Sequence, residues 1–379
     1  MPVAERKQLR KISVFVVGVV LGFGTTSFLV LQPPQIIAED SQWIRPAKPG
    51  DPLLWGRKGG IIFGLPSEGG LPGPRGLIRL GVISDKTGLP ELLNFIAIEP
   101  AVAGRRSRGD RMAFSELEPS RMDPGLQGKR LWVGPDGSSA QLSGTLSGTL
   151  SVTSSILPDR PKSIERLTVR IEVERFQANG AHVYLLASID SDHPDEVRIA
   201  VYRYEDSPKI EELTLTATMG NYERLRWLWL KDRVIDSREL YRSYHGDDFA
   251  EHGAYPLRKM LRDSDGDPIV FCTTNEANPQ LNPDFTAKDH WRYRLGRLTQ
   301  YWRVPASDIQ PNLRVRVNGR RVYWSSHAPL GGGIAFENFE VRQVYKPGQT
   351  FVFGVTRKEP WEIQPAIPHL AHARNPEVN

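Results

Sequence analysis

The feature that most constrains this chain is a series of short segments in which apolar and polar residues alternate. Residues 166–176 alternate apolar and charged side chains almost without interruption, a pattern typical of a β-strand with one buried and one solvated face. Asn179-Gly180 follows this segment and predicts a hairpin turn, and Asn318-Gly319 predicts a second hairpin further along the chain. Comparable segments lie at 181–189, 197–204, 212–219, 224–230, 334–345 and 350–355.

Many short strands separated by Gly, Pro and Asn turns predict a mainly β protein. We expect a large antiparallel β-sandwich over residues 59–358, with few short helices, for which 236–244 and 255–262 are the candidates. A propeller is disfavoured because no blade-length repeat occurs. Residues 39–58 are rich in Pro, Gly and Trp and are interpreted as a linker, and 359–379 as a C-terminal tail.

An uncharged, mostly apolar run of 20 residues, Ile12–Leu31, follows a basic cluster of Arg6, Lys7, Arg10 and Lys11. At about 1.5 Å per helical residue the run spans about 30 Å, the hydrocarbon thickness of a bilayer. The basic cluster predicts a cytoplasmic N-terminus and an extracytoplasmic remainder. We therefore interpret residues 1–38 as a basic stub and a single transmembrane helix that anchors the chain in the cell membrane. The alternative is a cleaved signal, which would leave a secreted or periplasmic protein.

The charge of the remaining chain argues against nucleic acid as a partner. Residues 1–38 carry four basic residues and one acid, a net +3, so only +2 of the total +5 remains for residues 39–379. Nucleic-acid binding calls for a concentrated basic face. The single cysteine, Cys272, lies in an apolar segment that predicts a buried strand, so we interpret it as a structural thiol.

No motif of a nucleotide, dinucleotide or common hydrolase site occurs, so catalytic candidates rest on local clusters. If 335–341 is a strand, Glu337 and Glu340 point to opposite faces, and a carboxylate partner must come from elsewhere, such as Glu276. His245 and Asp247 form an alternative acid–base or metal-binding pair. The competing interpretation of these clusters is ordinary surface charge.

Amide and aromatic side chains gather after the apolar strand predicted at 268–274. Amides and carboxylates bind sugar hydroxyls, and aromatic rings pack against the apolar face of a sugar ring. Arg75 lies in a glycine-rich loop, where it either binds an anion or fixes the turn. The predicted substrate-binding residues are Arg75, Asn275, Asn278, Trp291, Tyr293, Trp302 and Asn338.

Three carboxylates at alternate positions, Asp263, Asp265 and Asp267, surround Gly266. Hard cations such as Ca²⁺ prefer this ligand type. An EF-hand is excluded because the twelfth position of such a loop is Thr274, where a glutamate would be needed. The two open interpretations are a structural Ca²⁺ site and a solvated Asp-rich turn; no cofactor is otherwise required.

Five segments carry a resemblance to a known group of proteins: Gly60–Leu65, Gly73–Arg79, Asn94–Pro100, Thr216–Tyr222 and Phe336–Glu340. They resemble uncharacterised exported bacterial β-rich proteins, over most of residues 55–358. No biochemical role follows from this resemblance. A looser similarity in composition to carbohydrate-active β-sandwiches, including mutarotase-like supersandwiches, implies a supersandwich-like fold.

These observations together favour a membrane-anchored, extracytoplasmic protein that handles a polysaccharide or another cell-envelope glycan. The enzymatic version cleaves or isomerises the glycan, with Glu276 and Glu337 or His245 and Asp247 as catalytic groups. The non-enzymatic version binds carbohydrate or protein, and a third version is a structural envelope component. A converging acid–base pair would favour the enzyme, and an aromatic platform without such a pair would favour the binding module.

Overall fold

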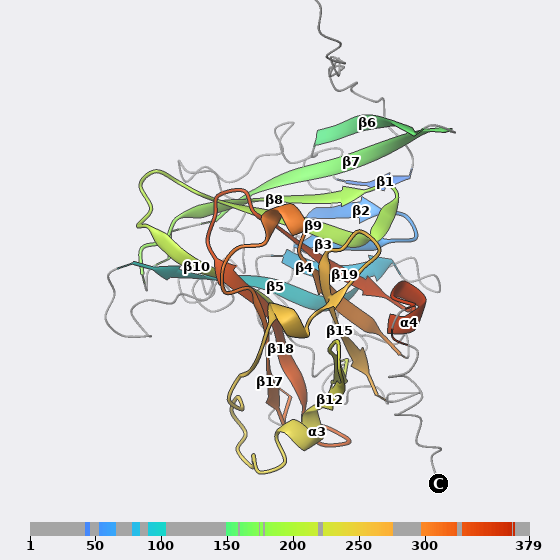
Figure 1. Cartoon of the computed structure of the whole chain (residues 1–379). Helices are drawn as coiled ribbons and strands as arrows, with labels where there is room; N and C mark the ends of the chain where they lie inside the picture. The colour runs from blue at the N-terminus through green and yellow to red at the C-terminus, as the bar shows by residue number, and fades with distance from the viewer. Residues whose placement is uncertain are drawn as a thin grey trace, which may run out of the picture. The chain divides into compact units, whose positions relative to one another are not determined.

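The structure is a computed structural model (Figure 1). It describes residues 42–45, 53–65, 78–83, 90–103, 149–157, 160–173, 175–176, 179–218, 223–275, 297–323, 328–365 and 367. They belong to one compact unit, Gln35–Asn379. The predicted membrane segment Ile12–Leu31 lies outside the described residues, and within them no helix is long and apolar enough to cross a membrane.

The described chain forms two antiparallel sheets. Sheet A has the strand order β1-β2-β3-β4-β5-β10-β18-β17-β13. Its strands are β1 (Trp43–Ile44), β2 (Leu53–Arg57), β3 (Ile61–Leu65), β4 (Ile78–Ile83), β5 (Pro90–Val102), β10 (Ile210–Thr218), β18 (Ala335–Val344), β17 (Arg314–Arg320) and β13 (Gly253–Pro256). The first five strands are neighbours in sequence, whereas β18 is inserted between β10 and β17.

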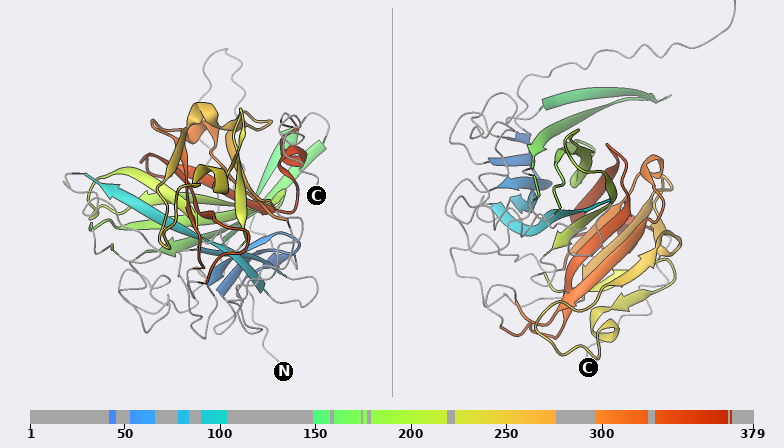
Figure 2. Two further views of the ribbon diagram at one scale, coloured as in Figure 1. Left: turned by 90° about the horizontal axis from the view of Figure 1, so that it is seen from below. Right: turned by 90° about the vertical axis from the view of Figure 1, so that its left-hand side faces the viewer.

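Sheet B has the order β12-β11-β15-β16-β19-β9-β8-β7-β6, with β14 paired to β15. Its strands are β12 (Val234–Asp236), β11 (Leu225–Trp229), β15 (Pro268–Thr274), β16 (Thr299–Arg303), β19 (Thr350–Thr356), β9 (His193–Arg203), β8 (Val183–Asp190), β7 (Arg160–Glu172), β6 (Thr149–Leu157) and β14 (Leu261–Arg262). The edge strand β6 lies at the top of Figure 1 and of the right-hand view in Figure 2.

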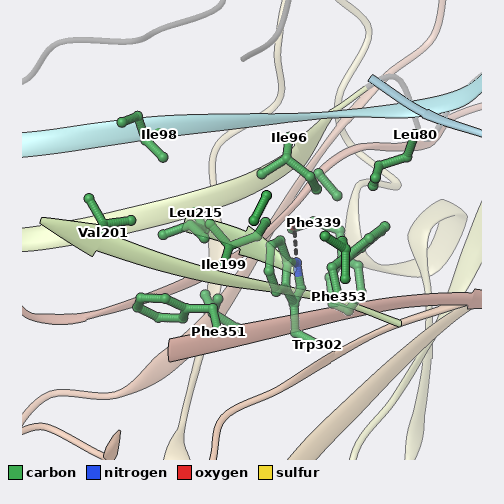
Figure 3. Close-up of a cluster of buried hydrophobic side chains, with 14 of the residues drawn as sticks. Leu80, Ile96, Ile98, Ile199, Val201, Leu215, Trp302, Phe339, Phe351 and Phe353 are labelled. Carbon is green, nitrogen blue, oxygen red and sulfur yellow. Dashed lines mark hydrogen bonds between the residues drawn. The ribbon is translucent and has the colours of Figure 1, made fainter. Parts of the chain in front are cut away.

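The two sheets pack face to face through one apolar core (Figure 3). Alternate residues of each central strand enter this core, as the period of two in a strand requires. Sheet A contributes Ile96, Ile98, Leu215 and Phe339, and sheet B contributes Ile199, Val201, Trp302, Phe351 and Phe353. The Trp302 indole N–H donates to the Phe339 carbonyl across the core, at 2.8 Å. A buried amide pair, Asn94 Nδ2 to Gln300 Oε1 at 2.7 Å, also joins the two sheets.

Two short α-helices lie at strand ends. Helix α3 (Ser237–Leu240) begins where the Asp236 side chain accepts a hydrogen bond from the Arg238 amide. The start of the helix expected over 236–244 is confirmed, but the helix ends at Leu240. Helix α4 (Pro360–Ile363) has Pro360 in its first turn and a capping box between Glu359 and Glu362. Two 3₁₀ turns, Leu257–Lys259 and Ala306–Asp308, complete the helical structure of the described residues.

The prediction of a mainly β, two-sheet architecture is confirmed, but the interpretation of three segments is wrong. The segment 39–58, expected to be a linker, contains β1 and β2, and Trp55 is fully buried against Phe63. Residues 255–262 form β13, a single 3₁₀ turn and β14 because the strand pairing of 253–256 takes their backbone groups. The segment 359–379, expected to be a tail, begins with α4, whose Trp361 packs on Trp229 with 5.9 Å between ring centroids.

The two Asn-Gly pairs behave differently. Gly180 has φ +76°, and the hairpin between β7 and β8 forms as predicted. The hairpin predicted at Asn318-Gly319 is wrong, because both residues lie inside the continuous strand β17. There the pairing shifts register, and Gly319 passes so close to β18 that a Cβ would lie 2.9 Å from the Ala335 carbonyl oxygen. This glycine therefore serves a β-bulge.

Candidate functional site

A polar surface lies on the side of sheet A that faces away from the core. Leu213, Leu215 and Ala217 of β10 point into the core, so the residues between them point to the opposite face. The same alternation holds in β18 and β17, where Val341 and Val317 are core residues. We call this group of residues the polar face of sheet A. It consists of Thr214, Thr216, Thr218, Arg316, Asn318, Asn338 and Glu340, all of them buried, and of His252 from the edge, which is partly exposed.

Glu340 lies at the centre of the polar face. It is paired with Thr216 on one side and with Arg316 on the other, in neighbouring strands. One carboxylate oxygen, Oε1, lies 3.0 Å from His252 Nε2, and the other, Oε2, lies 3.3 Å from Arg316 Nη1. The Glu340 side chain is fully buried, whereas 25 % of the His252 side chain is exposed. His252 thus connects a buried carboxylate with solvent.

Several polar atoms of this face have no hydrogen-bond partner among the residues that the structure describes. The acceptors are Asn338 Oδ1 and Glu340 Oε2, and the donor is Arg316 Nη1. The hydroxyls of Thr214 and Thr216 can both donate and accept. The ion pair between Arg316 and Glu340 therefore lacks hydrogen-bond geometry. Leaving a buried polar group unpaired costs about 1–3 kcal/mol, and most buried polar groups in proteins do have partners. The polar face therefore keeps hydrogen-bonding capacity that the described residues do not use.

The neighbouring row of side chains on this face contains Glu212, whose carboxylate is fully paired. Among the described residues of the face, the set of unpaired polar atoms ends at this row. Glu212 of β10 accepts hydrogen bonds from Arg314 and from Arg342, whose Nε lies 3.1 Å from Glu212 Oε2. Burial alone would raise the pKa of the Glu212 carboxyl, but the two arginines hold it below its ordinary value. The carboxylate at this end of the face is therefore fully paired within the protein.

Glu337, a predicted catalytic residue, lies outside the polar face. It occupies the β-bulge between β18 and β17 and is buried. A second buried carboxylate, Glu223, precedes β11 nearby; burial raises its pKa well above the ordinary value, and the charge of Glu337 raises it further. The predicted partner of Glu337, Glu276, lies outside the described residues, so that pairing stays a prediction.

Asn275, a predicted substrate-binding residue, contacts a fully buried arginine. Arg226 Nη1 donates to the Asn275 amide oxygen at 3.2 Å, and its other nitrogens donate to the carbonyls of Ile334, Gly331 and Gly333. Arg226 thereby fixes the loop that leads into β18, on which Glu337, Asn338 and Glu340 lie. Asn275 is therefore linked to the start of β18 through Arg226.

His245 and Asp247 lie in the exposed loop between α3 and β13. Their backbone carbonyls accept hydrogen bonds from Arg321 and Arg320 respectively, each at 3.2 Å. These contacts attach the loop to the end of β17. His252 ends the same loop, and its side chain contacts Glu340. An acid–base role for His245 and Asp247 stays a prediction.

The other predicted substrate-binding residues are distributed as follows. Asn338 belongs to the polar face, and its backbone N–H donates to Asn318 Oδ1 at 3.2 Å. Trp302 is fully buried in the core, where its ring lies 4.8 Å from that of Phe353, so the structure shows it as a packing residue. Arg75, Asn278, Trp291 and Tyr293 lie outside the described residues.

The predicted calcium ligands Asp263 and Asp267 contact a buried arginine. Arg303 Nη1 donates to Asp267 Oδ2 at 3.0 Å, and Arg303 Nε lies 3.6 Å from Asp263 Oδ2. Asp263 Oδ1 accepts from the backbone amides of Asp265 and Asp267, while the Asp265 side chain is exposed. No group of three or more candidate metal ligands occurs among the described residues. Calcium binding stays a prediction.

The described residues include two histidine–carboxylate contacts at hydrogen-bond distance. His182 Nδ1 lies 2.8 Å from Asp206, whose side chain is exposed, whereas His252 contacts the fully buried Glu340. A carboxylate on one imidazole nitrogen fixes the ring and stabilises its protonated form. The sequence placed Glu340 beside Glu337 but gave no sign of its contact with His252, which is 88 positions away. Only the register of β13, β17 and β18 brings them together. Comparisons of the chain with protein-family models, curated proteins and solved structures found no match.

Proposed function

We propose that this chain is a membrane-anchored, extracytoplasmic, supersandwich-like protein that binds a cell-envelope glycan on the polar face of sheet A. The observation that carries the proposal is the set of buried polar atoms without partners on β10, β17 and β18. The location rests on the apolar run Ile12–Leu31 and the basic cluster before it.

A polyhydroxylated ligand suits this set of atoms because it contains both donors and acceptors. Each sugar hydroxyl donates one hydrogen bond and accepts others, as the Thr214 and Thr216 hydroxyls also do. A hydroxyl beside Glu340 would donate to Oε2, and one beside Arg316 would accept from Nη1. Two inter-strand spacings of about 4.8 Å separate β10 from β17, so the central row is about 10 Å wide. That width suits a short stretch of a glycan chain.

The second candidate function is enzymatic cleavage or isomerisation of the same glycan. The specific observation in its favour is the 3.0 Å contact between His252 Nε2 and the fully buried Glu340. In this version His252 transfers a proton to or from the glycan, and Glu340 holds the imidazole and stabilises its positive charge.

A binding screen of the full chain in mild detergent, against neutral and acidic polysaccharides, tests the first proposal. We expect Thr216→Val and Glu340→Gln to weaken the binding of a retained polysaccharide at least fivefold. Thr153→Val, the same change on the exposed edge strand β6, is the matched control and should leave binding unchanged. Retained binding in both polar-face variants contradicts the proposal.

The same samples separate the two candidate functions. New reducing ends, or ultraviolet absorbance from unsaturated products, would identify an enzyme. If His252→Gln and Glu340→Gln both abolish product release while circular dichroism stays unchanged, the enzymatic function is supported. Binding without product supports the binding module.

A further inference from the structure

The outward side of sheet B carries arginines and tyrosines. Leu185 and Ala187 of β8, and Ile199 and Val201 of β9, are core residues, so the residues between them point outward. We call the resulting surface the arginine–tyrosine face of sheet B; it consists of Arg166, Arg170, Tyr184, Arg198, Tyr202 and Tyr204.

Arg198 differs from the other arginines of this face. It is half-buried in the middle of β9, between Ser188 of β8 and Val352 of β19. No hydrogen bond or ion pair of its guanidinium group occurs with the residues that the structure describes. Burial lowers the pKa of this group below its ordinary value, and the positive charge of Arg166 lowers it further. A buried arginine normally has an anionic partner.

Asp190 and Glu196, the two carboxylates whose charges act on Arg198, are bound by other arginines. Asp190 accepts hydrogen bonds from Arg166 Nε and Nη2, the latter at 2.7 Å. Glu196 accepts from the Tyr301 hydroxyl at 3.0 Å and also from Arg303. These contacts use both oxygens of each carboxylate. The five N–H donors of Arg198 thus remain available to a bound anion.

A row of aromatic rings lies further along the same strands. Tyr184 and Tyr202 stack with 5.0 Å between centroids and 7° between planes, and Tyr204 tilts against Tyr184 at 5.1 Å. The Arg170 guanidinium lies 3.7 Å from the centre of the Tyr184 ring and donates to the Tyr204 hydroxyl at 3.1 Å. Arg198 and Tyr202 are four residues apart on β9, about 13 Å at the rise of a strand. Cationic and aromatic groups therefore alternate along the face.

We propose that this face binds an acidic polysaccharide, with a uronate carboxylate on Arg198 and the neighbouring sugars beside the tyrosine row. The charge of Arg198 and its planar donor fork match a carboxylate, and the tyrosine edges and hydroxyls suit sugar rings. The choice of a polysaccharide follows the function proposed above. The site itself is separate, because it lies on the other sheet.

Binding of polygalacturonate to the full chain in mild detergent tests this inference. The fully methyl-esterified polymer is the matched ligand, because it keeps the sugar backbone and loses the charge. We expect the ester to bind at least fivefold more weakly, and Arg198→Gln to weaken polygalacturonate binding by a similar factor. Arg233→Gln, a change at an exposed arginine in the turn between β11 and β12, should leave the affinity unchanged.

Three results would overturn the inference: equal binding of acid and ester, unchanged binding by Arg198→Gln, or equal losses from Arg198→Gln and Arg233→Gln. The last would indicate general attraction of a polyanion to a basic protein. Thr216→Val separates this site from the polar face of sheet A. If Arg198-dependent binding persists while no glycan responds to Thr216→Val, the inference stands and the proposed function fails.

Discussion

The Arg303 network on the outer face of sheet B and the polar face of sheet A differ in how completely their buried charges are paired. On sheet B, Arg303 joins Glu196, Asp263 and Asp267, and Tyr301 adds a further hydrogen bond. On sheet A, Glu340, Arg316 and the adjacent threonines keep atoms without partners among the described residues. A complete network stabilises one native arrangement, whereas an incomplete one costs stability unless another molecule completes it. The Arg303 network of sheet B therefore stabilises the fold, whereas we propose that a bound glycan completes the polar face of sheet A.

The largest expected effect comes from breaking the Arg303 network. Arg303→Met leaves three carboxylates close together and partly buried, and removing one partner of a buried ion pair typically costs about 3–5 kcal/mol. Urea unfolding followed by tryptophan fluorescence measures the change. Arg262→Met removes an exposed arginine from the same turn and should cost under about 0.5 kcal/mol. Equal effects of the two variants would show that the network is unimportant for stability.

Glu223 is expected to make stability fall as pH rises. Burial raises its pKa in the folded protein, so between its ordinary and its raised pKa the folded state binds more protons than the unfolded state. Glu223→Gln removes this dependence and should be more stable than the wild type by about 2 kcal/mol at pH 8. The difference should disappear near pH 4. A difference that is constant with pH would contradict the raised pKa.

Glu212, on the paired end of sheet A, should behave in the opposite way. Its two arginines lower its pKa, so its contribution to stability is present above the ordinary pKa and is lost as pH falls through the lowered value. Glu212→Gln should cost about 1 kcal/mol at pH 7 after allowance for solvent screening. The cost should shrink toward zero in acid. Unfolding curves of both proteins between pH 2.5 and pH 7 measure this.

Which residues pair across neighbouring strands cannot be predicted from local sequence, and this limited what the sequence could show about the site. Alternation of apolar and charged residues predicts β7 and its hairpin correctly because both are local features. The Asn318-Gly319 pair has the same local signal, yet the close approach of Ala335 makes it a bulge. That bulge places Glu337 toward Glu223 while Glu340 meets His252. Sequence therefore names candidates such as Glu337 and Asn338 by residue type alone, whereas the contact between His252 and Glu340 depends on the pairing of three strands.

The smallest expected effect concerns the tyrosine row of sheet B. Arg170→Gln removes the cation–π contact with Tyr184 and should cost about 0.5 kcal/mol, because the arginine is exposed. Thermal unfolding monitored by near-ultraviolet circular dichroism is sensitive to these rings. A loss above about 2 kcal/mol would show that the row belongs to the structural network and is not a surface feature.

The double variant Thr214→Val, Thr216→Val tests most directly whether the polar face of sheet A is incomplete without a ligand. Valine has the shape of threonine without the hydroxyl, so the change removes two buried groups that have no partner among the described residues. Urea unfolding of the full chain in mild detergent, without any glycan, measures the result. We predict that stability rises by about 1–2 kcal/mol. A fall in stability would show that both hydroxyls already have partners in the free protein, and would contradict the account.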